Sequence, residues 1–288
     1  MTLIIILIAM AVEHFISVSD EMRRLGWFEY YQHWVENHLA HYKIWNGAGG
    51  VICTLLLPLL LVIIIDSTLR ELFLPLGLLF ALAVLLYTLG PKYLNAELDD
   101  YIDALEKGNK DEAEILASEF VSSETSIKQE QIIFENIFVQ ANERLFGVLF
   151  WFIVLGPFGA LFYRLAILLR IQQSDIHGNY ADAARDLCDI LNWPSARLLA
   201  LGFALSGDLV DAIEAWRKVE RQFLSANEDV IKACGLGSLS YQHPDATDVE
   251  LSLEDHHYWI RSLQGLLNRT LLVWLSVLGL MTLSGWLS

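Results

Sequence analysis

The sequence predicts an all-α polytopic membrane protein, with about four to five membrane helices and amphipathic helical hairpins between them. Of its 288 residues, 55% are hydrophobic and the mean hydropathy is +0.42, an apolar excess over soluble domains that indicates surrounding lipid. The charge is also segregated, because long uncharged stretches alternate with strongly acidic ones. Both observations are typical of a chain that crosses a membrane several times.

Membrane helices are expected where apolar stretches approach the roughly 20 residues that span the hydrocarbon core. Four stretches meet this condition, at residues 48–65, 72–89, 148–169 and 270–287. Backbone amides in lipid must be bonded within their own segment, which favours helix. Pro58 and Pro75 are expected to kink or to begin their helices.

The N-terminal stretch, residues 2–18, is shorter and contains Glu13. It lacks the basic region and the small-residue cleavage site of a signal peptide, so we interpret it as a retained first membrane helix. The predicted division of the chain has five parts: N-terminal membrane helices, an acidic helical segment, a membrane segment, a second polar helical segment and a C-terminal membrane helix. Their ranges are 1–89, 90–147, 148–169, 170–269 and 270–288.

The net charge of −16 lies in the polar segments. Residues 90–147 hold thirteen acidic and five basic residues, and residues 169–269 hold fifteen and nine. This acid excess excludes DNA or RNA as a partner. Apolar residues at helical spacing and turn signals predict helices within 95–121 (two of them), 128–147, 180–191, 195–206, 208–224 and 249–266.

The third apolar stretch contains Gly156-Pro157, with Gly159 close behind, a pattern that can break a helix near its middle. Basic residues near the ends of the apolar stretches favour the inner side for residues 90–147 and also for 169–269. Both can be inside only if 148–169 is a re-entrant hairpin or if another stretch fails to cross. The sequence leaves these alternatives open.

Several motifs are only weak evidence for a phosphate-binding or metal-binding site. Gly47-Ala48-Gly49-Gly50 lacks the lysine of a phosphate-binding loop, and close helix packing explains it better. His33, His38 and His41 lie near one another, but the tryptophans and tyrosines around them favour a helix at the membrane interface over a metal site. His256 and His257 point to different sides of a helix.

The three cysteines, Cys53, Cys188 and Cys234, have neither the number nor the spacing of a disulfide framework or a zinc site. We therefore expect no metal and no cofactor.

Ionisable residues within or beside the apolar stretches carry more weight, since burying a charge in lipid is costly unless it is paired. These residues are Glu13, Glu143, Arg144 and Arg164. In one interpretation the arginines extend to the lipid headgroups. In the other, Arg164 and Tyr163 bind an anionic ligand or Glu143 near the Gly-Pro break. Both interpretations remain open.

The run LFWFIVLGPFGALFYRL (149–165) resembles the signature of the AmpE proteins, inner-membrane proteins tied to β-lactamase induction. Those proteins are similar in turn to the adenosylcobinamide-phosphate synthases of the CobD/CbiB type. LEKGNKDEAEILASEFVSSET (105–125) resembles the helix pair and acid-Thr element of that superfamily, which contains Glu124 and Thr125 here. ILNWPSARLLAL (190–201), with Trp193 and Arg197, resembles its W-x-P-A-R-L element. Together with Glu13, the resemblance covers nearly the whole chain.

Two departures favour the AmpE branch. Where the synthases carry E-N-x-x-D-G, this chain has Val139 to Arg144 and keeps only the acid Glu143. Where they carry N-T-L-D, it has the apolar run Ala166 to Leu169. A ligase that activates a carboxylate needs charged groups to hold phosphate and metal. The Phe-Trp, Gly-Pro and Tyr-Arg residues of the AmpE pattern are all retained.

This resemblance implies a regulatory or sensory protein of the bacterial inner membrane, linked to peptidoglycan recycling, β-lactamase induction and antibiotic resistance, and more readily non-enzymatic than enzymatic. Besides the bilayer, the partners it implies are an AmpD-type amidase or a cell-wall muropeptide. The alternative is a diverged, amide-forming enzyme of the CobD/CbiB type. A transporter is disfavoured because no inverted repeat is evident. The candidate functional residues are Glu13, Glu124, Thr125, Glu143, Tyr163, Arg164, Trp193 and Arg197.

Overall fold

The computed structural model describes residues 2–15, 25–39, 45, 47–89, 94–120, 130–173, 178–219, 226–241 and 253–285. In these residues the regular structure is helical throughout, with no strand, which confirms the predicted fold class. The chain forms two compact units. Unit 1 comprises Met1–Pro91, Glu143–Trp193 and Leu287–Ser288, and unit 2 comprises Lys92–Asn142 and Pro194–Trp286.

Three helical stretches are long and apolar enough to cross a membrane: Ala48–Leu72, Ile132–Gln172 and Asp255–Leu283. Two shorter apolar helical stretches, Thr2–Glu13 and Leu74–Thr88, accompany them. The protein is therefore a polytopic membrane protein.

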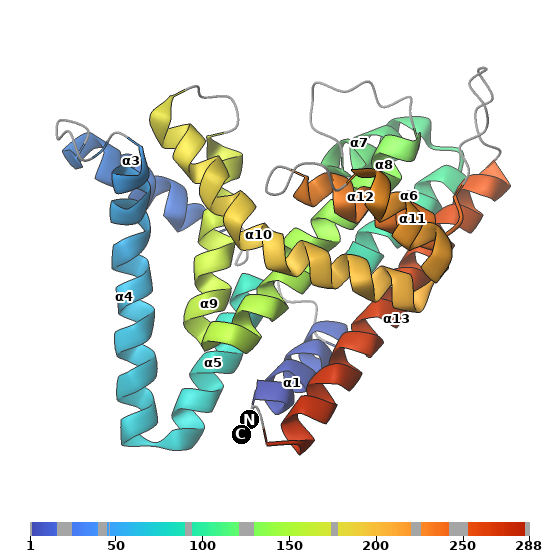
Figure 1. Cartoon of the computed structure of the whole chain (residues 1–288). Helices are drawn as coiled ribbons and strands as arrows, with labels where there is room; N and C mark the ends of the chain where they lie inside the picture. Colours follow the sequence, from blue (N-terminus) through green and yellow to red (C-terminus); the bar gives the residue numbers. More distant parts are fainter. Residues whose placement is uncertain are drawn as a thin grey trace. The chain divides into compact units, whose positions relative to one another are not determined.

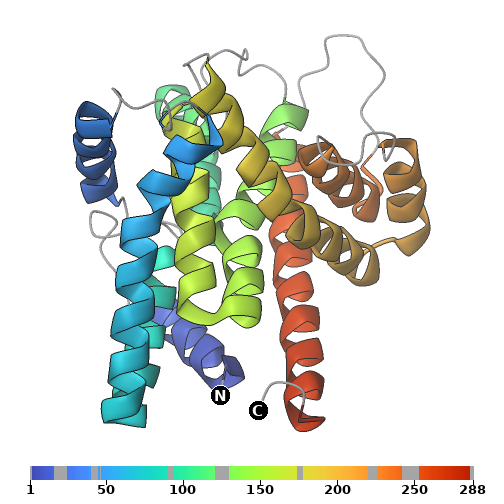
Figure 2. The ribbon, with the colours of Figure 1, turned by 60° about the vertical axis from the view of Figure 1, so that its left-hand side comes forward.

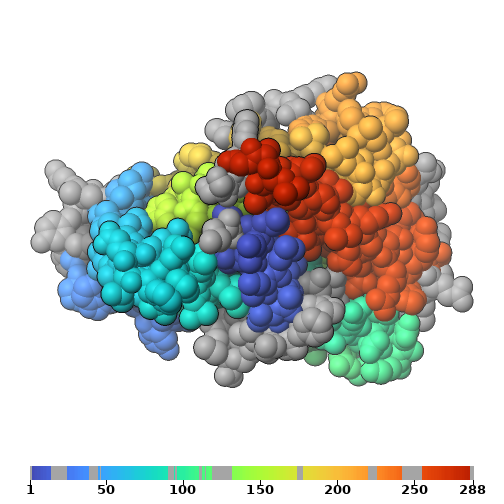
Figure 3. Space-filling model, turned by 90° about the horizontal axis from the view of Figure 1, so that it is seen from below, coloured from blue at the N-terminus to red at the C-terminus, as the bar shows by residue number. Residues whose placement is uncertain are grey.

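In unit 1, α4 (Ala48–Leu72) and α5 (Leu74–Thr88) form an antiparallel hairpin (Figure 1). The hairpin reverses at Phe73, which has an extended backbone (φ −161, ψ 112). Pro58 lies inside α4, whereas Pro75 lies in the first turn of α5, where a backbone N–H would have no partner within the helix and its absence removes no hydrogen bond. Seen from below, the ends of α4 and α5 lie side by side (Figure 3).

Helix α4 extends seven residues past the predicted end at residue 65. Polar side chains in its last turns form hydrogen bonds with other residues of the same helix, so the helix continues past the apolar stretch. Arg70 Nε donates to Asp66 Oδ1 at 3.0 Å, one turn away. Near its start, a Cβ on Gly50 would lie 2.8 Å from the Tyr180 ring, so glycine there permits close packing, as predicted.

Helices α1 (Thr2–Phe15) and α3 (Gly26–Leu39) complete the N-terminal part of unit 1. In α3 the exposed rings of Trp27, Tyr30 and Trp34 recur at helical spacing on one side of the helix. This arrangement supports the interfacial interpretation of the segment. His38 Nδ1 lies 2.8 Å from the Trp34 carbonyl, a bond within its own helix, and His41 lies outside the described residues.

Helix α9 (Gly147–Gln172) folds back on itself. Its one non-helical residue is Gly156, with φ 67 and ψ −151, and Figure 2 shows two arms side by side, joined at a tight turn. A Cβ on Gly147 would lie 2.3 Å from the Tyr163 hydroxyl, although a straight helix would separate these residues by about 24 Å. A Cβ on Gly159 would lie 2.2 Å from the Trp151 carbonyl oxygen. The predicted break is confirmed, and it produces a helical hairpin.

The segment before α9 differs from the prediction of one helix over 128–147. Helix α8 (Glu130–Ala141) is followed by a π-helical turn, η2 (Asn142–Phe146), which carries Glu143 and Arg144. A π turn inserts an extra residue and so changes which side of the helix the following residues face; such turns are frequent at functional sites.

Helix α10 (Asn179–Ser206) contradicts the prediction of separate helices at 180–191 and 195–206, because Pro194 lies inside one continuous helix. A proline removes one backbone hydrogen bond but can be accommodated when neighbouring packing supports the helix. Such support is present one turn earlier, where Trp151 Nε1 donates to the Leu191 carbonyl at 3.0 Å.

Unit 2 contains the predicted pair α6 (Leu94–Glu106) and α7 (Lys110–Phe120), joined through Gly108 at φ 68. Helix α11 (Leu209–Val219) lies inside the range predicted as 208–224 and packs on α12 (Asn227–Ser238), which was not predicted. The glycines of α12 masked its helical pattern.

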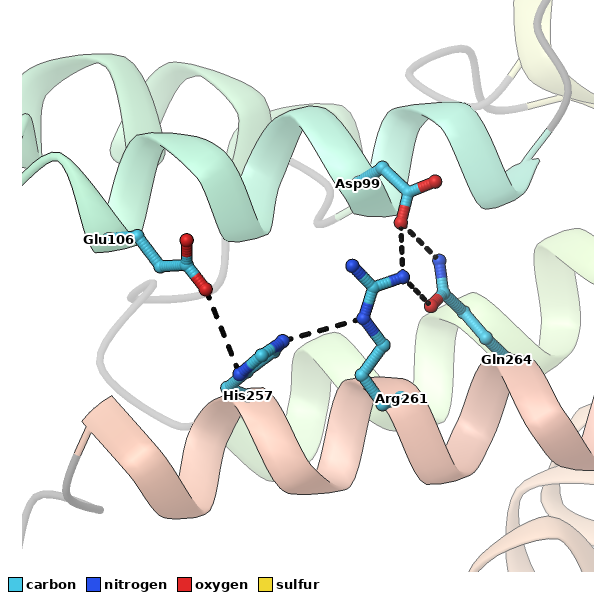
Figure 4. Close-up of polar contacts among 5 residues, drawn as sticks. All are labelled: Asp99, Glu106, His257, Arg261 and Gln264. Atoms are coloured by element: carbon cyan, nitrogen blue, oxygen red, sulfur yellow. Dashed lines mark hydrogen bonds and ion pairs between the residues drawn. The ribbon is translucent and has the colours of Figure 1, made fainter.

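Helix α13 (Leu253–Leu283) is continuous through the two helices predicted at 249–266 and 270–287. Figure 4 shows its polar contacts with α6. Arg261 Nη1 donates to Asp99 Oδ1 at 2.6 Å, Gln264 Nε2 donates to the same oxygen at 3.2 Å, and His257 Nδ1 lies 3.7 Å from Glu106 Oε1. Because the side chains of the two ion pairs, Arg261–Asp99 and His257–Glu106, are exposed, each pair contributes at most about 1 kcal/mol.

We expect Gly156→Ala to destabilise the protein by about 1–3 kcal/mol, because this positive-φ backbone conformation is essentially restricted to glycine. The measurement is thermal unfolding of the purified protein in detergent. Gly279→Ala is the matched control, since a Cβ there meets no atom within 4 Å. An equal effect of both substitutions would contradict the hairpin.

Candidate functional site

The fold-back of α9 brings a carboxylate and a guanidinium together from its two ends. Glu143, in η2, forms an ion pair with Arg170, in the last turn of α9. Their side chains are 11% and 22% exposed, so the pair is partly shielded from water. A charge-assisted hydrogen bond of this kind is about twice as strong as a neutral one. The ion pair therefore holds together the two ends of the hairpin, opposite its turn.

Tyr163 occupies the middle of the hairpin. It is fully buried, with its ring at the position that a side chain on Gly147 would take. Its hydroxyl donates to Asn192 Oδ1, on α10, at 2.6 Å. The absence of a side chain at Gly147 and this hydrogen bond together fix the ring between the first arm and α10.

Arg164 is a buried charged residue of the cluster whose hydrogen-bond donors are not all paired. The residue is only 6% exposed, and Nε is buried without a hydrogen-bond partner in the described part of the chain. The positive charge of Arg144 opposes it, and the carboxylate of Glu143 attracts it. A buried charge is costly unless paired and hydrogen-bonded, so this guanidinium has free capacity to bind an anionic group.

Cys188, on α10 beside the second arm, is a buried thiol. Burial raises the pKa of its thiol to about 12, and the thiol donates to the Ala166 carbonyl at 3.0 Å. Ala166, Ile167 and Leu169 are buried. The run that replaces the polar N-T-L-D element is therefore part of the core of this unit.

Of the eight candidate residues, the structure brings Glu143, Tyr163 and Arg164 together. Trp193 follows Asn192 on α10, at the end of the same unit. Arg197 belongs to unit 2 and donates to Asn227 Oδ1 there. Glu13 lies half-buried near the end of α1, and the predictions for Glu124 and Thr125 fall outside the described residues.

Sequence reasoning missed Arg170 and Asn192 as members of this cluster. A signal for Arg170 exists, because Glu143 precedes Gly156 by about as many residues as Arg170 follows it. Residues so placed pair if the segment folds back at the glycine. No local signal identifies Asn192, which is contributed by the following helix.

Within the described residues, no three His, Cys, Asp or Glu side chains come together in a group that could hold a metal ion.

Comparisons with known proteins identify relatives. The sequence model of one family, described as "CobD/Cbib protein", matches residues 6–242. The "Cobalamin biosynthesis protein CobD" of Stutzerimonas stutzeri (strain A1501) is 29% identical over 210 residues, 67% of this chain and 68% of that protein. The protein of the same description from Chromobacterium violaceum is 33% identical over 108 residues, 36% of this chain and 35% of that protein. No solved structure matches.

These matches correct the expected function. The relatives are named for cobalamin biosynthesis, so the prediction of an AmpE-type regulator of β-lactamase induction was wrong, and its amidase and muropeptide partners have no support. The two departures from the synthase motifs, at residues 139–144 and 166–169, therefore do not exclude the CobD/CbiB branch.

We expect Glu143→Gln to lower the free energy of unfolding by about 2 kcal/mol, because it leaves the partly buried Arg170 guanidinium without its carboxylate. Arg164→Met should change it by less than about 1 kcal/mol, because a similar apolar volume replaces an undercompensated charge. Unfolding of both variants in detergent measures the difference. If Arg164→Met costs as much as Glu143→Gln, the Arg164 guanidinium is satisfied in the native protein.

Proposed function

Because the chain belongs to the CobD/CbiB family, we propose that it is a membrane enzyme of cobalamin biosynthesis that forms an amide bond. Support comes from the relatives described as cobalamin biosynthesis proteins and from the family match over residues 6–242. We place the enzyme in the bacterial inner membrane as a multi-pass protein. The structural observation that carries the proposal is the buried Arg164 guanidinium with its unpartnered Nε beside Glu143.

In this proposal Arg164 binds the anionic part of a substrate. A guanidinium offers five donors in a fixed geometry that suits a carboxylate or a phosphate. In amide formation a nucleoside triphosphate first transfers a phosphoryl group to the carboxylate. The amine nitrogen then attacks the carbonyl carbon, negative charge develops on the carbonyl oxygen, and phosphate departs as the amine loses a proton. A preoriented cation in a site with little water stabilises that charge more than bulk solvent does.

The neighbours of Arg164 hold the site in shape. Glu143 pairs with Arg170, and Tyr163 is held between Gly147 and Asn192. These contacts leave the Arg164 side chain as the group with unused hydrogen-bonding capacity. Tyr163 and Glu143 therefore act as positioning residues in this proposal.

Apolar residues stand where the synthases have a polar N-T-L-D run, and this limits which residues can bind the group that activates the carboxylate. The apolar run Ala166 to Leu169 is largely core, so it cannot supply charge. Arg197 is not included, because its hydrogen bond goes to Asn227 within unit 2.

In the direct test, membranes that contain the chain are given a corrinoid carboxylic acid, a phosphorylated amino alcohol as the amine and a nucleoside triphosphate that activates the carboxylate, and formation of the amide, adenosylcobinamide phosphate, is followed. Product is separated by chromatography and identified by mass. We expect Arg164→Gln to lower the rate at least tenfold, since charge-assisted contacts of about 1.5–3 kcal/mol are lost.

Arg185→Gln is the matched control, because Arg185 is a less buried arginine of the same unit that pairs with Asp182. It should leave the rate unchanged. Absence of product with the unmodified chain would overturn the proposed reaction. An active Arg164→Gln variant would overturn the proposed site instead.

A further inference from the structure

A cavity of about 620 Å³ opens in unit 2 where the end of α10, the end of α12 and the first half of α13 meet. Its wall on α13 includes Tyr258, Ser262, Gly265 and Arg269, which recur at helical spacing on one side. This side differs from the one that binds α6 through Arg261. The volume suits a small ligand or a lipid headgroup.

The cavity contains polar groups with unused bonding capacity. Ser206 Oγ is buried without a hydrogen-bond partner, and Arg269 has no hydrogen bond or ion pair, both within the part of the chain that the structure describes. Asp208, which lines the cavity from the turn between α10 and α11, accepts hydrogen bonds from the Val210 and Asp211 amides at 2.9 and 3.0 Å through one oxygen, Oδ1. Oδ2 of Asp208 is not used in these two bonds. The cavity thus presents one cation and one anion.

The position of Arg269 along α13 indicates which level of a bilayer the cavity faces. Arg269 is the last charged residue of the chain, and residues 270–288 carry no charge. The side of α13 that lines the cavity continues below it as Leu272, Leu280 and Leu283, which are 63%, 67% and 87% exposed. The C-terminal turns of α13 lie open in the view of Figure 3. A polar cavity therefore joins an exposed apolar stripe at the level where a membrane helix meets headgroups.

We propose that this cavity binds the headgroup of phosphatidylethanolamine, with an acyl chain along the Leu272–Leu283 stripe. Arg269 and the Ser206 hydroxyl bind the phosphate, because a guanidinium and a hydroxyl are both donors to phosphate oxygens. Asp208 accepts hydrogen bonds from the ammonium, which has three donors, and the Trp259 ring in the wall adds a cation–π contact. A zwitterionic headgroup matches the paired charges better than a purely anionic one.

This lipid site is independent of the proposed reaction. All of its residues belong to unit 2, whereas the hairpin cluster belongs to unit 1. Variants at Arg164 should therefore retain the lipid, which separates a failure of this proposal from a failure of the proposed function.

The test is native mass spectrometry of the full chain in detergent after addition of equal amounts of phosphatidylethanolamine, phosphatidylcholine and phosphatidylglycerol. We expect the unmodified chain to retain phosphatidylethanolamine at least fivefold more than phosphatidylcholine, which has no N–H donors. Arg269→Gln should reduce retention about tenfold, because it removes the charge-assisted contact with phosphate.

Asp208→Asn removes the negative charge but keeps the helix cap, since asparagine caps as well as aspartate. It should abolish the preference for phosphatidylethanolamine. Arg217→Gln, on the exposed last turn of α11, is the charge-matched control and should change nothing. Equal retention of the three lipids, or no effect of Arg269→Gln, would overturn the proposal. Displacement by an equal concentration of soluble phosphoethanolamine would also overturn it and assign the cavity to a soluble phosphate ester.

Discussion

The contacts of the hairpin cluster depend on the reversal of α9 at Gly156 and Pro157. In a straight helix Glu143 and Arg170 would lie about 40 Å apart, and no side chain could join them. Gly156 adopts the positive-φ conformation that reverses the chain, and Pro157, which lacks a backbone donor, begins the second arm. Close approach then requires small residues where the arms touch, which Gly147 and Gly159 supply.

Residues of the family-like run at 149–165 are explained by this geometry. The Trp151 indole binds the Leu191 carbonyl, Gly156 makes the turn, and Tyr163 fills the space beside Gly147. Each of these residues has a structural role, so the run identifies a fold and does not distinguish a regulator from an enzyme. Arg164 is different, because its burial without a partner for Nε serves no evident structural purpose.

Features that depend on neighbouring residues could be predicted from the sequence. The apolar stretches, the α6–α7 pair with its stop at Gly108, and the break at Gly156 are of this kind, since each follows from local backbone chemistry. Helix α10 could not be predicted across Pro194, because its continuity depends on packing that no local pattern records. The Tyr163–Asn192 bond could not be predicted either, since it joins separate helices. The cluster was therefore found in part: the residues on α9 and η2 had local signals, and the partner on α10 did not.

The lengths of the two hairpin arms bear on how the protein is made. The first arm continues the helical stretch that begins before it, at Ile132, whereas the second arm, Pro157 to Gln172, rises only about 24 Å and by itself does not reach across the roughly 30 Å of hydrocarbon. An arm that entered lipid alone would also expose the charge of Arg164. The arms must therefore enter the bilayer together, after synthesis has passed Arg170 and its pairing with Glu143 can form. For this segment, insertion and folding are one event, unlike the successive stages by which independently stable membrane helices insert and then associate.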